Sequence, residues 1–513
     1  MSIHHPKIGK ILLSLFFTLF FNGCMVGPNY KPPINTIPDE WVETPSEDIL
    51  VTNDEPYDAW WYLFEDCLLD KYVEMAILYN NTLKTAEANI LQARALRVTS
   101  AANLFPQIAL DANATRTYFS KNGPLFVLSS PAGTTGPVDV DPTHPTRPLG
   151  TSGPIGTTFL SQIPQIQNLF NFLFDTIWEI DLFGRTRRGM EAADANIGSV
   201  IEQRNDILIS VLAETARSYI EIRSFQQRER LTQQNIDLLE KYVNITQKRL
   251  QTGISTLLDY QRIESELALA RSALPSILAQ MYQRIFSLSV LTGQLPEALL
   301  DELLPFQPLP TAPSYITIGL RSDLLRRRPD VRRAERQLAQ ATANVGVAVA
   351  SFYPSFTLNA FEGFQSLNLN NLFTGKSKTW SVGGDLHLPI FQGGLLIGNL
   401  RASEAVEKAA LFNYRETLLS AIQEAESALI AHTQDVITTD LLRKSVLSTR
   451  KVSELSGAQY LQGLIRITDL LDSERQLISS ELSLLDSETA TLIDLIALYK
   501  ALGGGYASLV PCL

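Results

Sequence analysis

The chain has 513 residues, a formal net charge of −11 and 45% hydrophobic residues. This length would ordinarily suggest about three domains of roughly 150 residues each. The acidic balance and five scattered histidines exclude the basic footprint expected of a nucleic-acid-binding protein.

The first 23 residues are predicted to be an export signal. Lysines precede an apolar run at 11–21 that is too short to span a bilayer. The run leads to Gly23-Cys24, the small residue and thiol that a bacterial lipoprotein signal requires, so Cys24 is the predicted lipidation site. A phenylalanine and an asparagine stand before Gly23 instead of the usual small aliphatic pair. An ordinary signal peptide with an incidental cysteine therefore remains the alternative.

The mature chain is predicted to start with a lipid-anchored tether at residues 24–58. Five prolines lie among polar residues between positions 29 and 56, a composition typical of an extended linker. The folded part is then predicted to form two repeats, 59–310 and 311–506. A short C-terminal tail at 507–513 completes the predicted organisation.

A change from helical to strand periodicity occurs twice and indicates the repeat. Between residues 322 and 352, small apolar side chains recur at alternating spacings of three and four, which predicts a tightly packed helix. Tyr353-Pro354 ends this pattern, and the following residues alternate between two faces as in a strand. The same joint occurs at Phe105-Pro106, so a duplicated module is the simplest explanation.

Each repeat is predicted to contain a β-hairpin, at about 105–183 and about 354–391. In the second strand, Phe172, Phe174 and Trp178 share one face while acidic residues share the other. This pattern, in strands about as long as a tilted span requires, indicates lipid on one side and water on the other. A soluble sheet with its polar face in solvent is the alternative.

Two proline-free stretches, 188–250 and 395–456, are predicted to be very long helices. At 1.5 Å per residue, about 62 residues would extend roughly 93 Å, far more than a compact domain needs. A soluble coiled coil would explain these helices but not the strands. Four strands cannot close a barrel, and open edges are not tolerated in lipid. Several chains are therefore expected to share one barrel, with the helices forming a tube below it.

The mature chain carries distinctive sequence blocks in a fixed order. They are CMVGPNYKPP at Cys24, WWYLFED at Trp60, WEIDLFGRTRRGMEAADA at Trp178, SDLLRRRPDVRRAERQLA at Ser322 and YKALGGGY at Tyr499. Together these blocks resemble the TolC-like outer-membrane efflux proteins, in particular the lipoprotein branch that serves resistance-nodulation-division pumps. The resemblance implies an α+β membrane protein. It would be a homotrimer whose twelve-stranded outer-membrane β-barrel, with four strands per chain, continues into a long periplasmic α-helical barrel.

The resemblance also implies a function and partners. The chain would be a passive outer-membrane channel that releases small molecules such as drugs. It would work with a periplasmic adaptor (membrane fusion) protein and an inner-membrane resistance-nodulation-division transporter. No metal site is expected, because the histidines have no ligand-spaced companions. No enzymatic activity, cofactor or nucleic-acid partner is expected either. A duct for type I protein secretion and a non-conducting structural periplasmic lipoprotein are the alternatives.

The family resemblance implies a gate near the turns that end the long helices. The family motif has a tyrosine three residues before a turn glycine, an arginine two after it, and aspartates six and nine after it. This chain supplies the tyrosine, the glycine and both aspartates, at Tyr460, Gly463, Asp469 and Asp472. It departs at the arginine, because Ile465 occupies that position and Arg466 follows. Asp259 is the matching acid of the first repeat.

The two aspartates that match between the repeats have a second interpretation. Aspartate is a preferred N-cap, and the spacing of Asp259 and Asp469 from the turns suits that role. Three copies of Asp469 around a narrow aperture would instead disfavour anions. The resemblance favours the gate for Asp469 and leaves both interpretations open for Asp259. The tips predicted to dock the adaptor are Gly253, Ile254, Ser255, Gly463 and Leu464.

Overall fold

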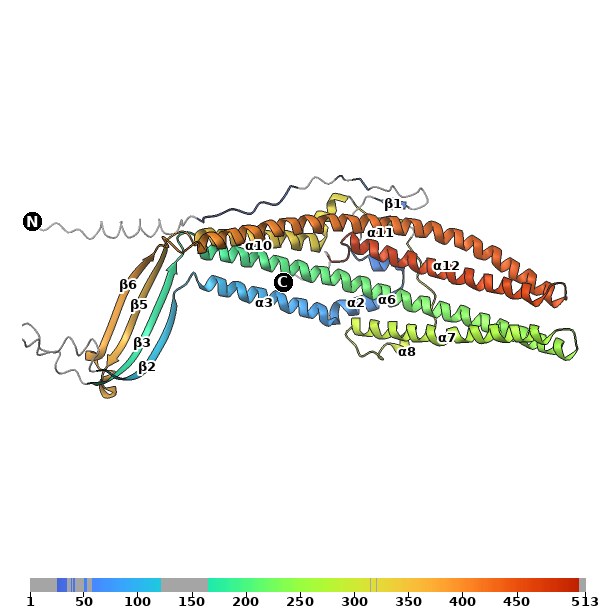
Figure 1. The fold of residues 1–513 in the computed structure, drawn as a ribbon, viewed down its shortest axis with the longest axis horizontal. Helices are drawn as coiled ribbons and strands as arrows, with labels where there is room; N and C mark the ends of the chain where they lie inside the picture. The colour runs from blue at the N-terminus through green and yellow to red at the C-terminus, as the bar shows by residue number, and fades with distance from the viewer. Residues whose placement is uncertain are drawn as a thin grey trace, which may run out of the picture. The chain divides into compact units, whose positions relative to one another are not determined.

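The computed structural model describes residues 25–34, 38, 40–41, 50–52, 58–120, 165–313, 315–319 and 321–506. The predicted export signal, Cys24 and the predicted tail at 507–513 lie outside these described residues. The described chain forms two compact units, one built on a β-sheet and the other on helices (Figure 1).

The first unit is a four-stranded antiparallel sheet in the order β2-β3-β5-β6. Its strands are β2 (Gln107–Tyr118), β3 (Ile166–Ile180), β5 (Ser355–Ser366) and β6 (Lys378–His387). The central pairing joins the two hairpins, with Ile177 of β3 opposite Asn359 of β5. Strands from both repeats therefore form one sheet, and β2 and β6 are its edges within this chain.

The second unit is dominated by two pairs of long helices. They are α6 (Arg185–Gln251), α7 (Leu257–Leu291), α11 (Leu395–Leu461) and α12 (Ile467–Ala501). α7 returns alongside α6, and α12 returns alongside α11 (Figure 1). The first members have 67 residues each and the second members 35 each, so the two pairs match in length. At 1.5 Å per residue, each 67-residue helix extends about 100 Å.

One predicted helix boundary was wrong. The stretch expected to end at residue 456, before Gly457, continues as α11 to Leu461. Gly457 therefore lies inside α11, and its lack of a side chain makes room for Tyr242 of α6. A Cβ atom at this position would lie 3.0 Å from the Tyr242 hydroxyl of α6.

Shorter helices complete each repeat. Both predicted helix-to-strand joints are present, since α3 (Asn81–Ala102) precedes β2 and α10 (Pro329–Ala350) precedes β5. The remaining elements are α2 (Cys67–Tyr79), α8 (Leu300–Leu303), α9 (Leu324–Arg327), η1 (Trp60–Phe64), η2 (Arg321–Asp323), η3 (Leu369–Asn371), η4 (Gly375–Ser377), β1 (Leu50–Thr52) and β4 (Tyr315–Thr317). β1 pairs with β4 in parallel, so the predicted tether contacts the folded chain.

The main hydrophobic core includes the middle of α6 and α11 and the C-terminal ends of α7 and α12. Trp60 and Trp61 are buried there, and the Trp60 ring stacks on Tyr499 of α12 with centroids 5.6 Å apart. The Tyr219 hydroxyl of α6 donates to Asp66, the residue that caps α2, over 2.7 Å. This core therefore joins the start of the folded chain to its last helix.

Candidate functional site

The sheet has one largely apolar and one polar face. Residues that oppose each other in register point to the same side, so the register shows which residues share a face. Leu110 lies opposite Phe174 on the apolar face. Large apolar side chains on this face are exposed in the single chain: Ile108, Leu110, Phe174, Leu358, Trp380, Val382 and Leu386. Glu362 and Lys378 also lie on this face and form an ion pair at 2.8 Å. An exposed and otherwise largely apolar face of this kind marks a surface that contacts lipid or protein. The shared face predicted for Phe172, Phe174 and Trp178 of β3 is confirmed.

The opposite face is crossed by a row of side-chain amides. Asn171 of β3 donates to Asn113 of β2 over 2.9 Å. Gln365 of β5 donates to the amide oxygen of Asn171, also over 2.9 Å. Asp175 and Asp385 lie on the same face. These polar groups suit contact with water, since unpaired polar groups facing an apolar medium would be unfavourable.

The two predicted tips are tight turns that join the paired helices. Gly253 and Gly463 have φ values of 75° and 77°, which L-residues rarely adopt. A Cβ atom at either glycine would meet nothing within 4 Å, so backbone conformation alone requires glycine there. Ile254 and Leu464 are 74% and 69% exposed at these turns. Each tip therefore presents an apolar side chain.

Asp259 and Asp469 both cap the helix that follows their turn. The Asp259 amide donates to the Thr256 hydroxyl over 3.2 Å, and the Thr256 amide donates to the Asp259 carboxylate over 3.2 Å. The Arg466 amide donates in the same way to Asp469 over 3.3 Å. Arginine has no side-chain acceptor, so only this half of the capping box can form at Arg466. The N-cap residues are Thr256 and Arg466, so the prediction that the aspartates are N-caps was wrong in position. Asp259 and Asp469 lie three residues later and complete the cap by accepting from the N-cap amide.

The predicted gate residues are only partly brought together. The Arg466 guanidinium lies 3.4 Å from Asp469 within the same turn. Desolvation opposes ionisation of this carboxyl, but its hydrogen bonds from the Arg466 amide and guanidinium outweigh that effect and lower the pKa of Asp469. Asp472 instead faces Arg475 at 3.7 Å, and Arg475 also donates to Glu266 of α7 over 2.5 Å. Asp472 and Arg475 line a groove of about 430 Å³ between α7 and α12.

Tyr460 is buried against α6 by contacts that the sequence did not reveal. Both terminal nitrogens of Arg249 donate to the Tyr460 carbonyl over 3.2 Å, and one also donates to the Leu461 carbonyl over 2.9 Å. The guanidinium carbon lies 4.6 Å from the centre of the Tyr460 ring. The Tyr460 hydroxyl is 2.9 Å from the Thr246 hydroxyl. Arg249 of the first helix pair therefore caps the end of α11 in the second pair.

We call the contacts of Arg249 and Thr246 with the end of α11 the clamp. A buried polar contact lies beside it. The Tyr242 hydroxyl of α6 donates to Glu474 of α12 over 3.4 Å, and the Tyr242 ring meets Tyr460 edge to face at 6.2 Å. Burial raises the pKa of the Glu474 carboxyl and raises the pKa of Tyr242 to about 12. Three helices thus meet through polar side chains within one apolar cluster. Its buried apolar members include Ile236, Leu239, Ile263, Leu267, Leu470 and Leu471.

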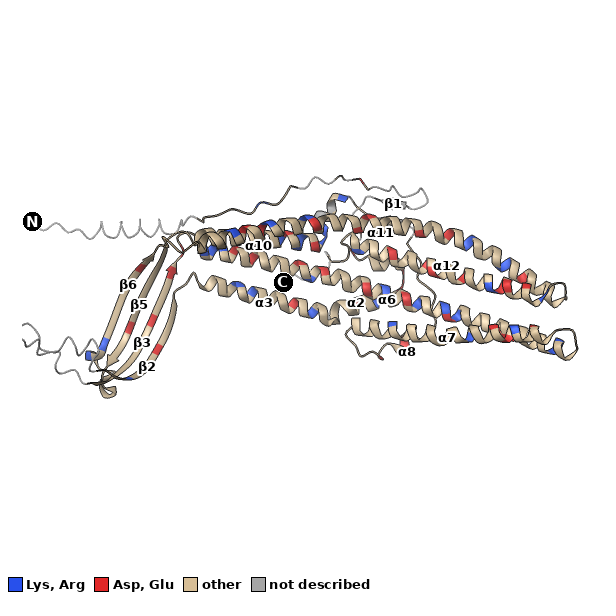
Figure 2. Cartoon of the chain, viewed as in Figure 1, with Lys and Arg blue, Asp and Glu red and all other residues tan. Residues whose placement is uncertain are grey.

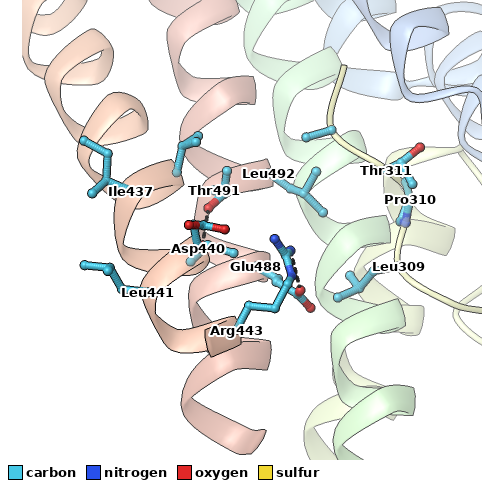
Figure 3. A pocket seen from close by; sticks show the side chains of 13 residues that line it. Leu309, Pro310, Thr311, Ile437, Asp440, Leu441, Arg443, Glu488, Thr491 and Leu492 are labelled. Carbon is cyan, nitrogen blue, oxygen red and sulfur yellow. Dashed lines mark hydrogen bonds and ion pairs between the residues drawn. The ribbon is translucent and has the colours of Figure 1, made fainter. Parts of the chain in front are cut away.

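A wider groove of about 840 Å³ lies between residues 309–312, α11 and α12 (Figure 3). At its edge Arg443 donates to Glu488 over 3.0 Å. The hydroxyls of Thr439 and Thr491 lie 3.0 Å apart and satisfy each other. The polar groups that line this groove are paired for packing between helices and do not form an activated nucleophile.

Surface charge, metal ligands and membrane-spanning helices further limit the chemistry, and none of the long helices carries charge of one sign alone (Figure 2). Acidic and basic side chains are interspersed along α6, α7, α11 and α12 (Figure 2). In the part of the chain that the structure describes, no three histidine, cysteine or acidic side chains are gathered as metal ligands. Among the same residues, no helix is both long and apolar enough to cross a membrane.

Residues 72–294 and 320–504 match the outer membrane efflux protein family. Because these two stretches make up most of the chain, the protein belongs to that family. It is therefore an outer-membrane efflux channel protein of the TolC-like kind and not an enzyme.

Similar proteins agree with this assignment. Nodulation protein T of Rhizobium leguminosarum bv. viciae is 28% identical, over 97% of this chain and 94% of that protein. The probable efflux pump outer membrane protein TtgC of Pseudomonas putida is also 28% identical, over 97% of this chain and 96% of its own. The solved outer-membrane channel OprN superposes with a TM-score of 0.80 at 28% identity, covering 94% of this chain and 99% of the other.

Proposed function

We propose that the chain is the outer-membrane exit channel of a tripartite efflux system. It would passively conduct small molecules such as drugs, received from an inner-membrane resistance-nodulation-division transporter and its periplasmic adaptor. The observation that carries the proposal is the four-stranded sheet, with an exposed apolar face, an amide-lined face and two unpaired edges within the chain. TtgC, named as an efflux pump outer membrane protein, supports the assignment to a pump.

The sheet is proposed to close only with other copies. Edge strands β2 and β6 expose backbone hydrogen-bonding groups that lipid cannot satisfy. Three copies would supply twelve strands, with β6 of one copy pairing with β2 of the next. The amide face would then line a water-filled lumen, and the apolar face would contact lipid. The long helices would continue as a periplasmic tube.

The export signal, the lipid anchor and the boundaries of the two repeats are proposed to be those that the sequence predicts. Residues 1–23 would be removed on export, and Cys24 would carry the lipid that anchors the tether at 24–58. The two repeats would extend over 59–310 and 311–506.

The gate is proposed to be held by the clamp between the two helix pairs. Opening requires α11 and α12 to move relative to α6, and three contacts oppose that motion. They are the Arg249 hydrogen bonds to the end of α11, its position over the Tyr460 ring, and the contact between Thr246 and Tyr460. Asp469, with Arg466 beside it, would supply negative charge at the aperture. Asp472 and Asp259 would add to the negative charge near the tips, and all three aspartates also bind local partners.

The exposed turns are proposed to dock the adaptor. Ile254 and Leu464 project apolar side chains from two tips that share the same backbone form. An apolar side chain on a rigid turn loses little conformational freedom on binding. Gly253, Ser255 and Gly463 would contribute mainly by fixing the shape of these turns.

Planar-bilayer conductance of the purified protein tests the channel and its clamp together. Arg249→Ala is expected to raise the open probability several-fold, because it removes the cap on α11. Arg271→Ala is the matched control, since Arg271 makes an exposed ion pair with Glu240 away from Tyr460. Current that is unaffected by Arg249→Ala would reject the clamp and keep the channel. Absence of current in all variants would reject the channel.

A further inference from the structure

The first described residues of the chain are docked against the helices. One terminal nitrogen of Arg188, in α6, donates to the Gly27 carbonyl over 3.2 Å and to the Asn29 side-chain oxygen over 2.7 Å. The other donates to Glu191 over 2.7 Å. Arg188 is only 1% exposed, so water cannot easily satisfy its donors. The guanidinium is buried with its hydrogen bonds satisfied because the N-terminal segment supplies acceptors.

Two glycines set how closely the segment approaches. Gly27 has a φ of 89°, and a Cβ atom there would lie 2.6 Å from the Cα of Gly346 in α10. A Cβ atom on Gly346 would in turn lie 2.8 Å from Arg188. A single methyl group at either position would therefore push the segment or the guanidinium out of place. This contact fits the backbone of one particular peptide and is not a general apolar groove.

Further contacts extend the docked segment in both directions. The Tyr30 hydroxyl donates to Glu335 of α10 over 3.1 Å. Within the sheet unit, the Val26 amide donates to the Phe183 carbonyl over 3.2 Å, and Met25 packs where a Gly184 side chain would otherwise lie. Met25 and Val26 are thus held by one unit of the chain, and Gly27 to Tyr30 by the other.

We propose that Gly27–Tyr30 is a docking motif and that Arg188 is the residue that positions it. The motif fastens the mature N-terminus to α6 and α10 at a fixed point, ahead of the remaining tether. Lipid on Cys24 is part of the function proposed above. If Cys24 carries lipid, the anchor pulls directly on the helical body and not through a slack linker. Arg188 then has a specific task within the WEIDLFGRTRRGMEAADA block, because it receives the segment that follows Cys24.

Limited proteolysis with thermolysin tests the docking in the full-length, detergent-purified protein. Mass spectrometry would follow cleavage between residues 25 and 34 and, as an internal reference, cleavage within α12. Arg188→Ala is expected to speed the N-terminal cuts at least tenfold while leaving α12 unchanged. Arg185→Ala is the matched control, because Arg185 is 53% exposed and its ion pair with Glu179 is long, at 3.9 Å.

Further variants separate docking from general stability and from lipidation. Asn29→Ala is expected to give a smaller acceleration and to add nothing in the Arg188→Ala background, because both act through one contact. If Arg188→Ala also speeds cleavage within α12, the protein is destabilised as a whole and Asn29→Ala becomes the deciding variant. Asn29→Ala must then accelerate the N-terminal cuts and leave α12 unchanged. Cys24→Ala should leave the segment protected. Unchanged N-terminal cleavage in Arg188→Ala or in the deciding Asn29→Ala would overturn the proposal, whether or not the protein conducts.

Discussion

At the residue scale, Asp469 combines a local contact with a proposed collective role. Its carboxylate caps α12 through the Arg466 amide, and its side chain is still 45% exposed. A residue that is needed for the cap can also contribute charge to an aperture, so the two interpretations drawn from the sequence are compatible. The structure shows Asp469 accepting from the N-cap amide of Arg466, and the charge at the aperture stays a prediction.

Asp469→Asn separates these two roles, because asparagine can still accept the capping hydrogen bond but carries no charge. We expect cation selectivity to fall several-fold with little change in helix stability, and Asp259→Asn to have a weaker effect. The hydrogen bonds that lower the pKa of Asp469 stabilise its ionised form, so wild-type selectivity should persist from pH 7.5 to pH 5.5. Reversal potentials in a salt gradient measure both effects. Equal selectivity in wild type and Asp469→Asn would contradict the assignment.

The contacts around Tyr460 show what residue spacing could not predict. The match to the family motif identified Tyr460 as a candidate but gave no partner for it. Arg249 is 211 positions earlier in the chain and reaches backbone carbonyls, which carry no sequence signature. A basic residue in the last turn of α6 would ordinarily be expected to cap its own helix. Only the packing of the two helix pairs shows that it caps α11.

At the element scale, the periodicity of the sequence was sufficient for most helices and strands. Both joints, both glycine turns and the shared face of Phe172, Phe174 and Trp178 could be predicted, because a period of two differs clearly from one of 3.6. The end of α11 was predicted five residues too early, at residue 456 instead of Leu461. Gly457 serves packing, and its neighbour Tyr242 is distant in the sequence.

A matched pair of substitutions in β6 tests the assignment of its faces. Val382 lies on the exposed apolar face, and the adjacent Ser381 lies on the polar face. Val382→Lys is expected to destabilise the membrane-inserted protein by about 2 kcal/mol or more, whereas Ser381→Lys should be tolerated. Denaturant unfolding in lipid vesicles measures the difference. Equal effects of the two lysines would favour a soluble sheet.

At the scale of the whole molecule, the account depends on closure. In the described residues, the sheet of β2, β3, β5 and β6 has four strands, an exposed and largely apolar face, and two edges with no partner strand. These features are unfavourable unless lipid and neighbouring copies cover them. The sequence predicted that several chains must combine, but strand closure alone does not fix their number. Three copies follow from the family resemblance together with the count of strands.

The mass of the purified, detergent-solubilised particle tests this central claim most directly. Native mass spectrometry should give three times the mass of the mature chain, because twelve strands are then available to close one barrel. A stable particle containing a single chain would contradict the account, since its four strands could not enclose a channel.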